Sequence, residues 1–117
     1  MLARPRRLRS SRDINRVYKT GRFGGAENLS VKSLDRHRAD SRAVVVVGKK
    51  VSKKAVDRNK IRRQLSELLA KDWQQIKVGC DIVVTVKTST LTLTVTQLEA
   101  QLKRALTKAG ASRGNNV

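Results

Sequence analysis

Residues 53–65 read KKAVDRNKIRRQL, a dense run of positive charge in which apolar side chains recur at helical spacing. At about 100° per residue, the apolar side chains that continue this pattern share one arc of a helix: Ile61, Leu65, Leu68 and Leu69. The neighbouring arc carries a polar set, Arg58, Asn59, Arg62 and Arg63, with Lys60 beyond it. We therefore predict a helix over about 55–73 that packs one side on a core and presents guanidiniums on the other.

Guanidiniums held in fixed positions suit a phosphate-rich partner, because each planar group can bind two phosphate oxygens at once. Asn59 adds a donor and an acceptor that suit bases or sugars. Four lysines lead into the helix and extend the charge: Lys49, Lys50, Lys53 and Lys54. The alternative interpretation of these basic residues is an ordinary solvated helix face, but the pattern favours a nucleic-acid contact surface.

The charge of the whole chain favours the same partner. The formal net charge is +18, and 20 of the 27 lysines and arginines lie in residues 1–63. Self-repulsion of this size opposes compaction, so a polyanionic partner is the economical explanation. A membrane-binding helix would need exposed aromatic or leucine side chains. The chain has only Tyr18, Phe23 and Trp73 as aromatics, and its helix leucines are needed in a core, so we expect no membrane partner.

The length of 117 residues predicts a single domain. We expect a flexible basic arm over 1–10, one RNA-binding domain over 11–110, and a disordered tail over 111–117. Residues 13–19 have helical spacing, with a cap at Ser11 or Asp13 and a stop at Gly21.

Three later segments have the composition of strands: 29–34, 42–48 and 80–86. The second holds four successive valines, which predicts a strand covered on both faces. A last helix over 95–109 would follow a capping box, formed either by Thr94 with Gln97 or by Thr96 with Glu99.

The remaining residues that could carry chemistry have simpler interpretations. The lone Cys80 lacks a disulfide partner and reads as a small buried residue. Asp57 favours the helix dipole, His37 lies in an exposed turn, and Trp73 fills the core. We find no nucleophile–base pair, no paired carboxylates and no metal-ligand spacing, so we predict no catalytic or metal-binding residues. The start of the chain lacks a secretory apolar segment, which predicts a cytoplasmic protein.

In this order, these motifs resemble the family of bacterial ribonuclease P protein subunits. The hallmark is Arg58-Asn59 followed by Ile61-Arg62-Arg63, after a valine-rich strand and the pair Lys49-Lys50. Further agreement lies in Arg7-Leu8, in Asp13-Ile14, in residues 17–21 and in Leu93-Thr94. The likeness covers about residues 6–109.

The resemblance implies an α/β (α+β) two-layer sandwich in the order αβββαβα. Its mixed sheet would contain a left-handed βαβ crossover, similar to the second domain of a small-subunit ribosomal protein. It also implies that a large RNA with bound Mg²⁺ removes the 5′ leader of precursor tRNA, with one protein per RNA and no activity from the protein alone. The RNA-contacting set would be Arg58, Asn59, Lys60, Arg62 and Arg63, with Tyr18 in a leader-binding cleft.

Some positions depart from the family pattern. Ser66 stands where another basic residue is common, and Ile14, Leu29 and Lys32 stand at cleft positions that are aromatic in the family. If the chain binds a leader as the resemblance implies, these missing aromatics predict that charge contributes more than stacking to leader binding.

Two other functions remain open at this point. One is a ribosomal or other structural RNA-binding protein of similar fold, which would promote no cleavage. The other is a helix-turn-helix DNA-binding protein, which would need a short helix and turn before the basic helix rather than a valine strand.

Overall fold

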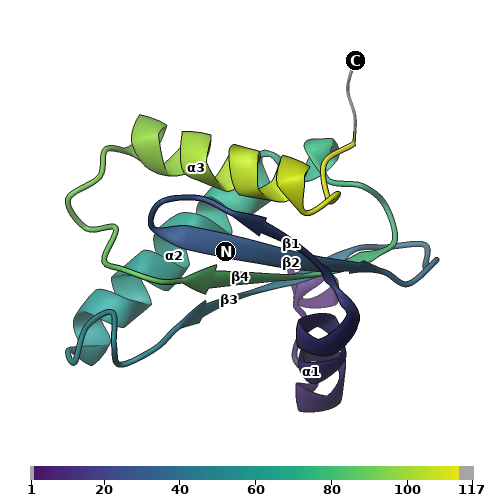
Figure 1. The fold of residues 1–117 in the computed structure, drawn as a ribbon, viewed down its shortest axis with the longest axis horizontal. Helices are drawn as coiled ribbons and strands as arrows, with labels where there is room; N and C mark the ends of the chain where they lie inside the picture. The colour runs from purple at the N-terminus through teal and green to yellow at the C-terminus, as the bar shows by residue number, and fades with distance from the viewer. Residues whose placement is uncertain (1, 114–117) are drawn as a thin grey trace.

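A computed structural model describes residues 2–113, which form three α-helices and a four-stranded sheet (Figure 1). The helices are α1 (Ser11–Thr20), α2 (Ala55–Lys71) and α3 (Val95–Lys108). The strands are β1 (Arg22–Gly25), β2 (Leu29–Asp35), β3 (Arg42–Val47) and β4 (Cys80–Val86). Short 3-10 helices at Arg4–Arg6 and Trp73–Gln75 precede α1 and follow α2. The α-helices and strands follow the predicted order αβββαβα.

The sheet is mixed and has the strand order β1-β2-β4-β3. β2 pairs antiparallel with β1 and β4, whereas β3 and β4 run parallel and are joined through α2. The strand covered on both faces is β4, where only Thr85 is not fully buried. We expected such cover for the valine strand, and that expectation was wrong. β3 lies at the edge of the sheet, and Val44 and Val46 are half-buried.

The helices cover the two faces of the sheet unequally (Figure 1). α2 and α3 lie over one face and enclose the main core with it, which includes Ile61, Leu65 and Leu102. α1 lies against the other face, where Val17 packs on Val83. Because α1 covers only part of that face, the rest keeps a set of half-buried side chains that we call the open face: Ser30, Lys32, Val44, Val46 and Thr85.

Local signals set the helix ends. The α3 capping box is the one formed by Thr94 and Gln97, with the Gln97 N–H donating to Thr94 Oγ1 at 3.1 Å. The α1 cap is Ser10 and neither predicted residue, because Ser10 Oγ accepts from the Asp13 N–H. α2 ends at Lys71, since a 3-10 turn replaces its predicted last residues.

Both chain ends lie against the domain as far as they are described. We expected residues 1–10 to form a flexible arm, yet Leu2 and Leu8 are buried, and the Leu8 N–H donates to Ala43 O at 2.9 Å. The Arg6 guanidinium stands 5.2 Å from the centre of the Trp73 ring. The predicted disordered tail does not hold for residues 111–113, because Ala111 is fully buried. The rest of that tail, 114–117, lies outside the described residues.

A buried carboxylate joins α1 to the sheet. Asp81 on β4 is fully buried and accepts two hydrogen bonds from Arg42, at 3.0 and 2.8 Å. Arg36 donates to the same carboxylate at 3.2 Å, and both arginines also pair with Asp13 of α1. Partial burial of Asp13 raises its pKa, but the charges and hydrogen bonds of Arg42 and Arg36 together outweigh this and leave the pKa below its usual value. This group, which we call the neutralised cluster, fixes the start of α1 on the sheet.

Candidate nucleic-acid interface

The helix α2 has the predicted division between a buried and an exposed side. Its apolar arc is buried in the main core: Ile61, Leu65, Leu68 and Leu69. The polar residues on the other side form what we call the α2 basic surface: Arg58, Asn59, Lys60, Arg62 and Arg63. Arg58 and Arg62 are half-buried, and the other three are exposed. The buried arc fixes the helix, so the guanidiniums project from a rigid support.

Two arginines of the α2 basic surface, Arg58 and Arg62, are oriented without being neutralised. Arg58 Nη1 donates to the backbone carbonyl of Ser52 at 2.9 Å, and Arg62 donates to the side-chain oxygen of Asn59. Within residues 2–113, no arginine or lysine of this surface forms an ion pair with a carboxylate. Neutral oxygens set the direction of these groups and leave their charge available to a partner.

The lysines before α2 sit on an anchored loop. Lys49 and Lys50 occupy the corner of a turn that the Val51 N–H closes onto Gly48 O at 3.1 Å. Val51 packs against the main core and fixes this turn. All four predicted lysines are exposed: Lys49, Lys50, Lys53 and Lys54.

Asp57 fastens this loop to the helix. Its carboxylate accepts from Ser52 Oγ at 3.0 Å, while the same hydroxyl accepts from the Lys54 N–H at 3.2 Å. Asp57 also lies in the first turn of α2, where a negative charge is favourable. The contacts therefore agree with the structural interpretation of this residue.

A pocket of about 510 Å³ lies between α2, β3 and the segment before α1. We call it the edge pocket, and it is lined by Leu2, Arg7, Leu8, Arg9, residues 43–45, Asn59, Arg62, Arg63 and Ser66. The charge and spacing of the sequence alone indicate no contact role for Arg7 and Arg9. The sequence pattern that could have indicated their exposure is the alternation Arg7-Leu8-Arg9. In the structure Leu8 is buried and both arginines are exposed. The fold thus adds cations from the start of the chain to those of α2.

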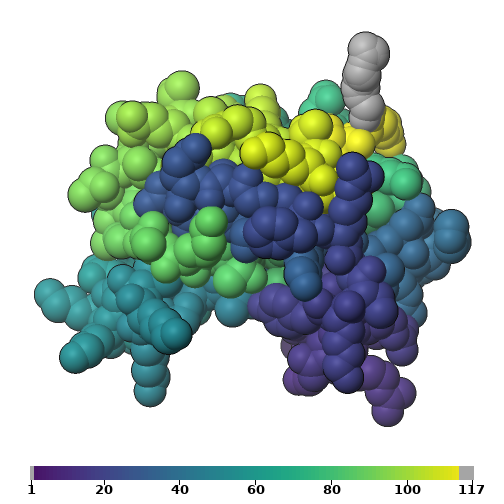
Figure 2. Space-filling model, viewed as in Figure 1, coloured from purple at the N-terminus to yellow at the C-terminus, as the bar shows by residue number. Residues whose placement is uncertain are grey.

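Tyr18 borders the open face. Its hydroxyl lies 3.3 Å from Thr85 Oγ1 on β4, and the residue as a whole remains 37% exposed. Figure 2 shows a hollow beside this face, with α1 in purple on one side and the loop before α2 in teal on the other. Val44 lines the edge pocket and also packs beneath α1, so the open face and the edge pocket adjoin at β3.

The three positions at which the family pattern has aromatics differ in their surroundings. Lys32 lies on the open face and donates from Nζ to the Tyr18 carbonyl. Ile14, which belongs to α1, packs against the small apolar cluster beneath that helix. Leu29 is fully buried in the main core on the opposite face, so it cannot line the open face.

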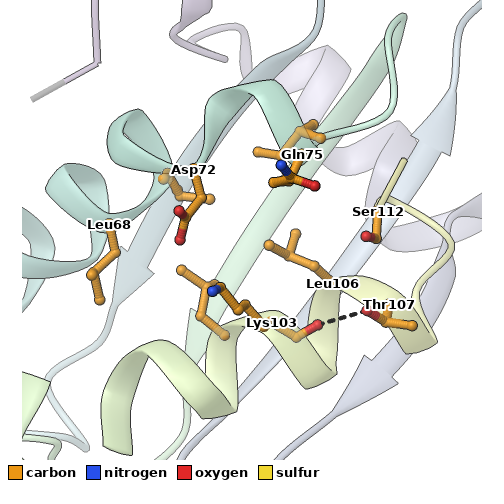
Figure 3. A pocket seen from close by; sticks show the side chains of 10 residues that line it. Leu68, Asp72, Gln75, Lys103, Leu106, Thr107 and Ser112 are labelled. Atoms are coloured by element: carbon orange, nitrogen blue, oxygen red, sulfur yellow. Dashed lines mark hydrogen bonds between the residues drawn. The ribbon is translucent and has the colours of Figure 1, made fainter. Parts of the chain in front are cut away.

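A second pocket, of about 310 Å³, lies between α2 and α3 (Figure 3). Leucines from both helices form much of its wall, and Asp72 and Lys103 project toward it. Burial raises the pKa of Asp72, and a hydrogen bond with Glu99 raises it further. With one cation beside a carboxylate, this pocket lacks the positive surplus that phosphate binding needs.

Cys80 gives no sign of a reactive thiol. It is buried, and that burial raises the pKa of its thiol. The part of the chain that the structure describes holds no group of three or more His, Cys, Asp or Glu side chains arranged to bind a metal.

In residues 2–113, no helix combines the length and apolar character that crossing a bilayer requires.

Comparison with known proteins agrees with this geometry. The family model described as Ribonuclease P matches residues 2–110. A ribonuclease P protein component from Pseudanabaena sp. is 40% identical, over 98% of this chain and 100% of its own. Among solved structures, a Staphylococcus aureus RNase P protein mutant with defective mRNA degradation activity is 26% identical, covers 92% of this chain and 90% of its own, and has a TM-score of 0.81. The RNase P protein from Thermotoga maritima is 28% identical, covers 83% and 91%, and has a TM-score of 0.75.

Fold and site together define a small α/β nucleic-acid-binding protein whose basic helix is anchored in its core. The chain belongs to the ribonuclease P protein family. It is an RNA-binding protein component of ribonuclease P, acts in tRNA processing, and has the ribonuclease P RNA as its partner. A structural ribosomal protein is therefore not favoured, and the strand β3 before α2 excludes a helix-turn-helix arrangement at this site.

Proposed function

We propose that this protein assists a catalytic RNA in removing the 5′ leader from precursor tRNA and performs none of the bond-breaking chemistry itself. In this proposal the RNA holds most of the Mg²⁺ for cleavage, and one protein binds one RNA. The protein contributes positive charge where the catalytic RNA and the leader converge. Neutralising phosphates there raises the affinity for the substrate. We propose that the affinity for Mg²⁺ rises because the leader is held in place by the protein.

The observation that carries the proposal is the unneutralised charge of the α2 basic surface. Arg58, Arg62 and Arg63 are held by a buried apolar arc and pair with no carboxylate in residues 2–113. We assign the contacts with the catalytic RNA to this surface and to the lysines at 49, 50, 53 and 54. Arg7 and Arg9 join the set because they line the same edge pocket.

We assign the leader to the open face beside Tyr18. An unpaired strand can stack a base on an exposed aromatic ring, and the half-buried Thr85 and Ser30 offer hydroxyl groups. The open face adjoins the edge pocket, so one RNA path can run from the α2 basic surface across the sheet. We also propose that the protein acts in the cytoplasm.

The decisive experiment adds the purified protein to a bacterial ribonuclease P RNA at low Mg²⁺. We expect faster cleavage of precursor tRNA at its 5′ end than with the RNA alone, and no cleavage by the protein alone. Unchanged cleavage would contradict the proposal and would favour a purely structural RNA-binding role.

A second experiment tests the leader assignment. The affinity of the reconstituted complex is measured for precursor tRNA with a long leader, with a short leader, and for mature tRNA. We expect shortening the leader to weaken binding, and the presence of the protein to leave the affinity for mature tRNA little changed. If the protein raises the affinity for all three RNAs equally, the leader does not lie on the open face.

A further inference from the structure

Phe23 on β1 is an aromatic residue with 59% of its surface exposed, more than Tyr18. A single exposed apolar residue needs no explanation by itself. The position of this ring on the sheet is what makes it informative.

Two glycines establish that position. A Cβ at Gly24 would lie 2.3 Å from the Ala105 carbonyl oxygen, so residue 24 faces α3. Side chains alternate along a strand, so Phe23 and Gly25 face the opposite side, which is the side of α1. A Cβ at Gly25 would lie 3.2 Å from both Cε2 and Cζ of Phe23. The ring therefore leans over Gly25, and the missing side chain makes room for it.

The strand register extends this site to Tyr18. Gly25 pairs with Ser30, Ser30 with Thr85, and Thr85 with Val46. These residues form one row across the open face, with the Phe23 ring at its β1 end and the Tyr18 hydroxyl against Thr85 in its middle. Adjacent strands lie about 4.8 Å apart, so Gly25 and Thr85 are about 10 Å apart. The other end of the row, Val46, lies next to the chain that leads into the lysine loop.

Lys32 supplies charge between the two rings. It is the cross-strand partner of Phe23, and its Nζ donates to the Tyr18 carbonyl. An exposed ring, a cation and a second exposed ring thus follow one another on the same face. Aromatic platforms with positive charge along the path of the backbone are the usual way to bind unpaired RNA.

We propose that Phe23 is a second stacking platform of the open face, which takes a base of the unpaired leader beyond the nucleotide at Tyr18. This inference rests on the proposed function, because it requires the leader to cross the open face. It also assigns a role to Gly25, whose missing Cβ leaves room for the ring over the sheet. The aromatic that the family pattern has at position 32 is thereby replaced by a ring one strand away.

The test uses the complex reconstituted from the full chain and a bacterial ribonuclease P RNA. We expect Phe23→Ala to weaken binding of precursor tRNA with a long leader by about tenfold, within the range known for single base–aromatic stacks. The affinity for mature tRNA should not change. Phe23→Tyr should retain binding, whereas Phe23→Leu should behave as Phe23→Ala because it is apolar without an aromatic face. Val95→Ala removes another exposed apolar side chain, on α3, and should have no effect.

A fluorescent adenine analogue placed at successive leader positions gives a second readout, because stacking quenches its emission. Phe23→Ala should restore emission at a different position from Tyr18→Ala. Binding that is unchanged in Phe23→Ala, or rescued equally by Leu and Tyr, would overturn the inference. If Tyr18→Ala still lowers long-leader affinity in that case, the proposed function stands. If the wild-type complex shows no dependence on leader length, the leader assignment itself fails, and the inference fails with it.

Discussion

Two groups of arginines in this protein have the same chemistry and opposite surroundings. In the neutralised cluster, Arg36 and Arg42 share the buried carboxylate of Asp81 and a second one from Asp13. On the α2 basic surface, Arg58 and Arg62 are bonded to neutral oxygens. The first arrangement joins a helix to a sheet, and the second leaves positive charge for a partner.

Arginine content alone therefore does not define a nucleic-acid interface. A guanidinium that binds a buried carboxylate in two places contributes little to the outer field, because its charge is compensated. A guanidinium held by a carbonyl keeps its full charge in a chosen direction. The carboxylate partners, more than the arginines, separate structural from functional positions here.

The largest expected effect concerns the neutralised cluster. Asp81→Ala removes the carboxylate that Arg42 and Arg36 share, and it leaves two partly buried charges with only Asp13 as partner. We expect the free energy of unfolding to fall by about 3 kcal/mol in urea titrations, as for other broken buried pairs. Glu67→Ala, an exposed carboxylate on α2, is the control and should cost less than about 0.5 kcal/mol. Equal losses would show that Asp81 has no special role.

The next effect concerns the α2 basic surface. Arg62→Ala with Arg63→Ala should weaken binding of the ribonuclease P RNA and flatten its salt dependence. Each lost phosphate contact lowers the slope of log affinity against log salt by about 0.7–0.9. The unfolding free energy should change by less than about 0.5 kcal/mol per residue.

Arg36→Ala is the matched control for this double variant. It should lose stability and keep the salt slope, because its charge is already compensated within the protein. An unaltered salt slope in Arg62→Ala with Arg63→Ala would remove those residues from the interface. It would also contradict the distinction between the two groups of arginines.

A smaller effect is expected at the edge pocket. Arg9→Ala should lower the salt slope by about one contact, 0.7–0.9, because its side chain is exposed and lines the pocket with Arg62. Arg104→Ala is the control, since its guanidinium pairs with Glu27 on another surface. Filter-binding titrations over a range of salt would measure both. A slope equal to that of the wild type in Arg9→Ala would restrict the interface to α2 and its loop.

The smallest effect concerns pH. Two hydrogen bonds from Arg104, at 3.0 and 2.7 Å, lower the pKa of Glu27 from 4.5 to about 2. A carboxyl whose pKa is lowered by folding stabilises the fold when the pH is above its pKa in the unfolded chain. This contribution is lost as the pH falls from 4.5 toward 2. We expect a small decrease in the melting temperature over that interval, reduced in Glu27→Gln. The pair is exposed, so an identical acid profile in both proteins would show that solvent screens it completely.

Much of the fold could be predicted because its signals are local. The apolar arc of α2, the Thr94–Gln97 capping box and the strand at 80–86 all act over a few residues. The predictions that failed concern relations between distant segments. The valine run could not reveal that β3 is an edge strand, and Leu2 and Leu8 gave no periodic signal for their place in the core. Strand order and the docking of chain ends depend on contacts made across the whole fold.

The candidate site shows the same division. The α2 residues and the loop lysines were found from spacing and charge, whereas Arg7, Arg9 and Phe23 were not assigned to it. Arg7 and Arg9 enter only because the segment before α1 runs beside β3. Phe23 enters only through the register of β1 and the space over Gly25.

Local sequence pattern suffices to place one helix with a buried side and a basic side, because a period of 3.6 residues needs no distant partner. Contacts between distant segments set which arginines keep their charge. Arg42 meets Asp81 because β3 and β4 pair in parallel with these two residues in register. In residues 2–113, no ion pair joins a carboxylate to Arg58, Arg62 or Arg63, and their charge therefore remains available to a partner.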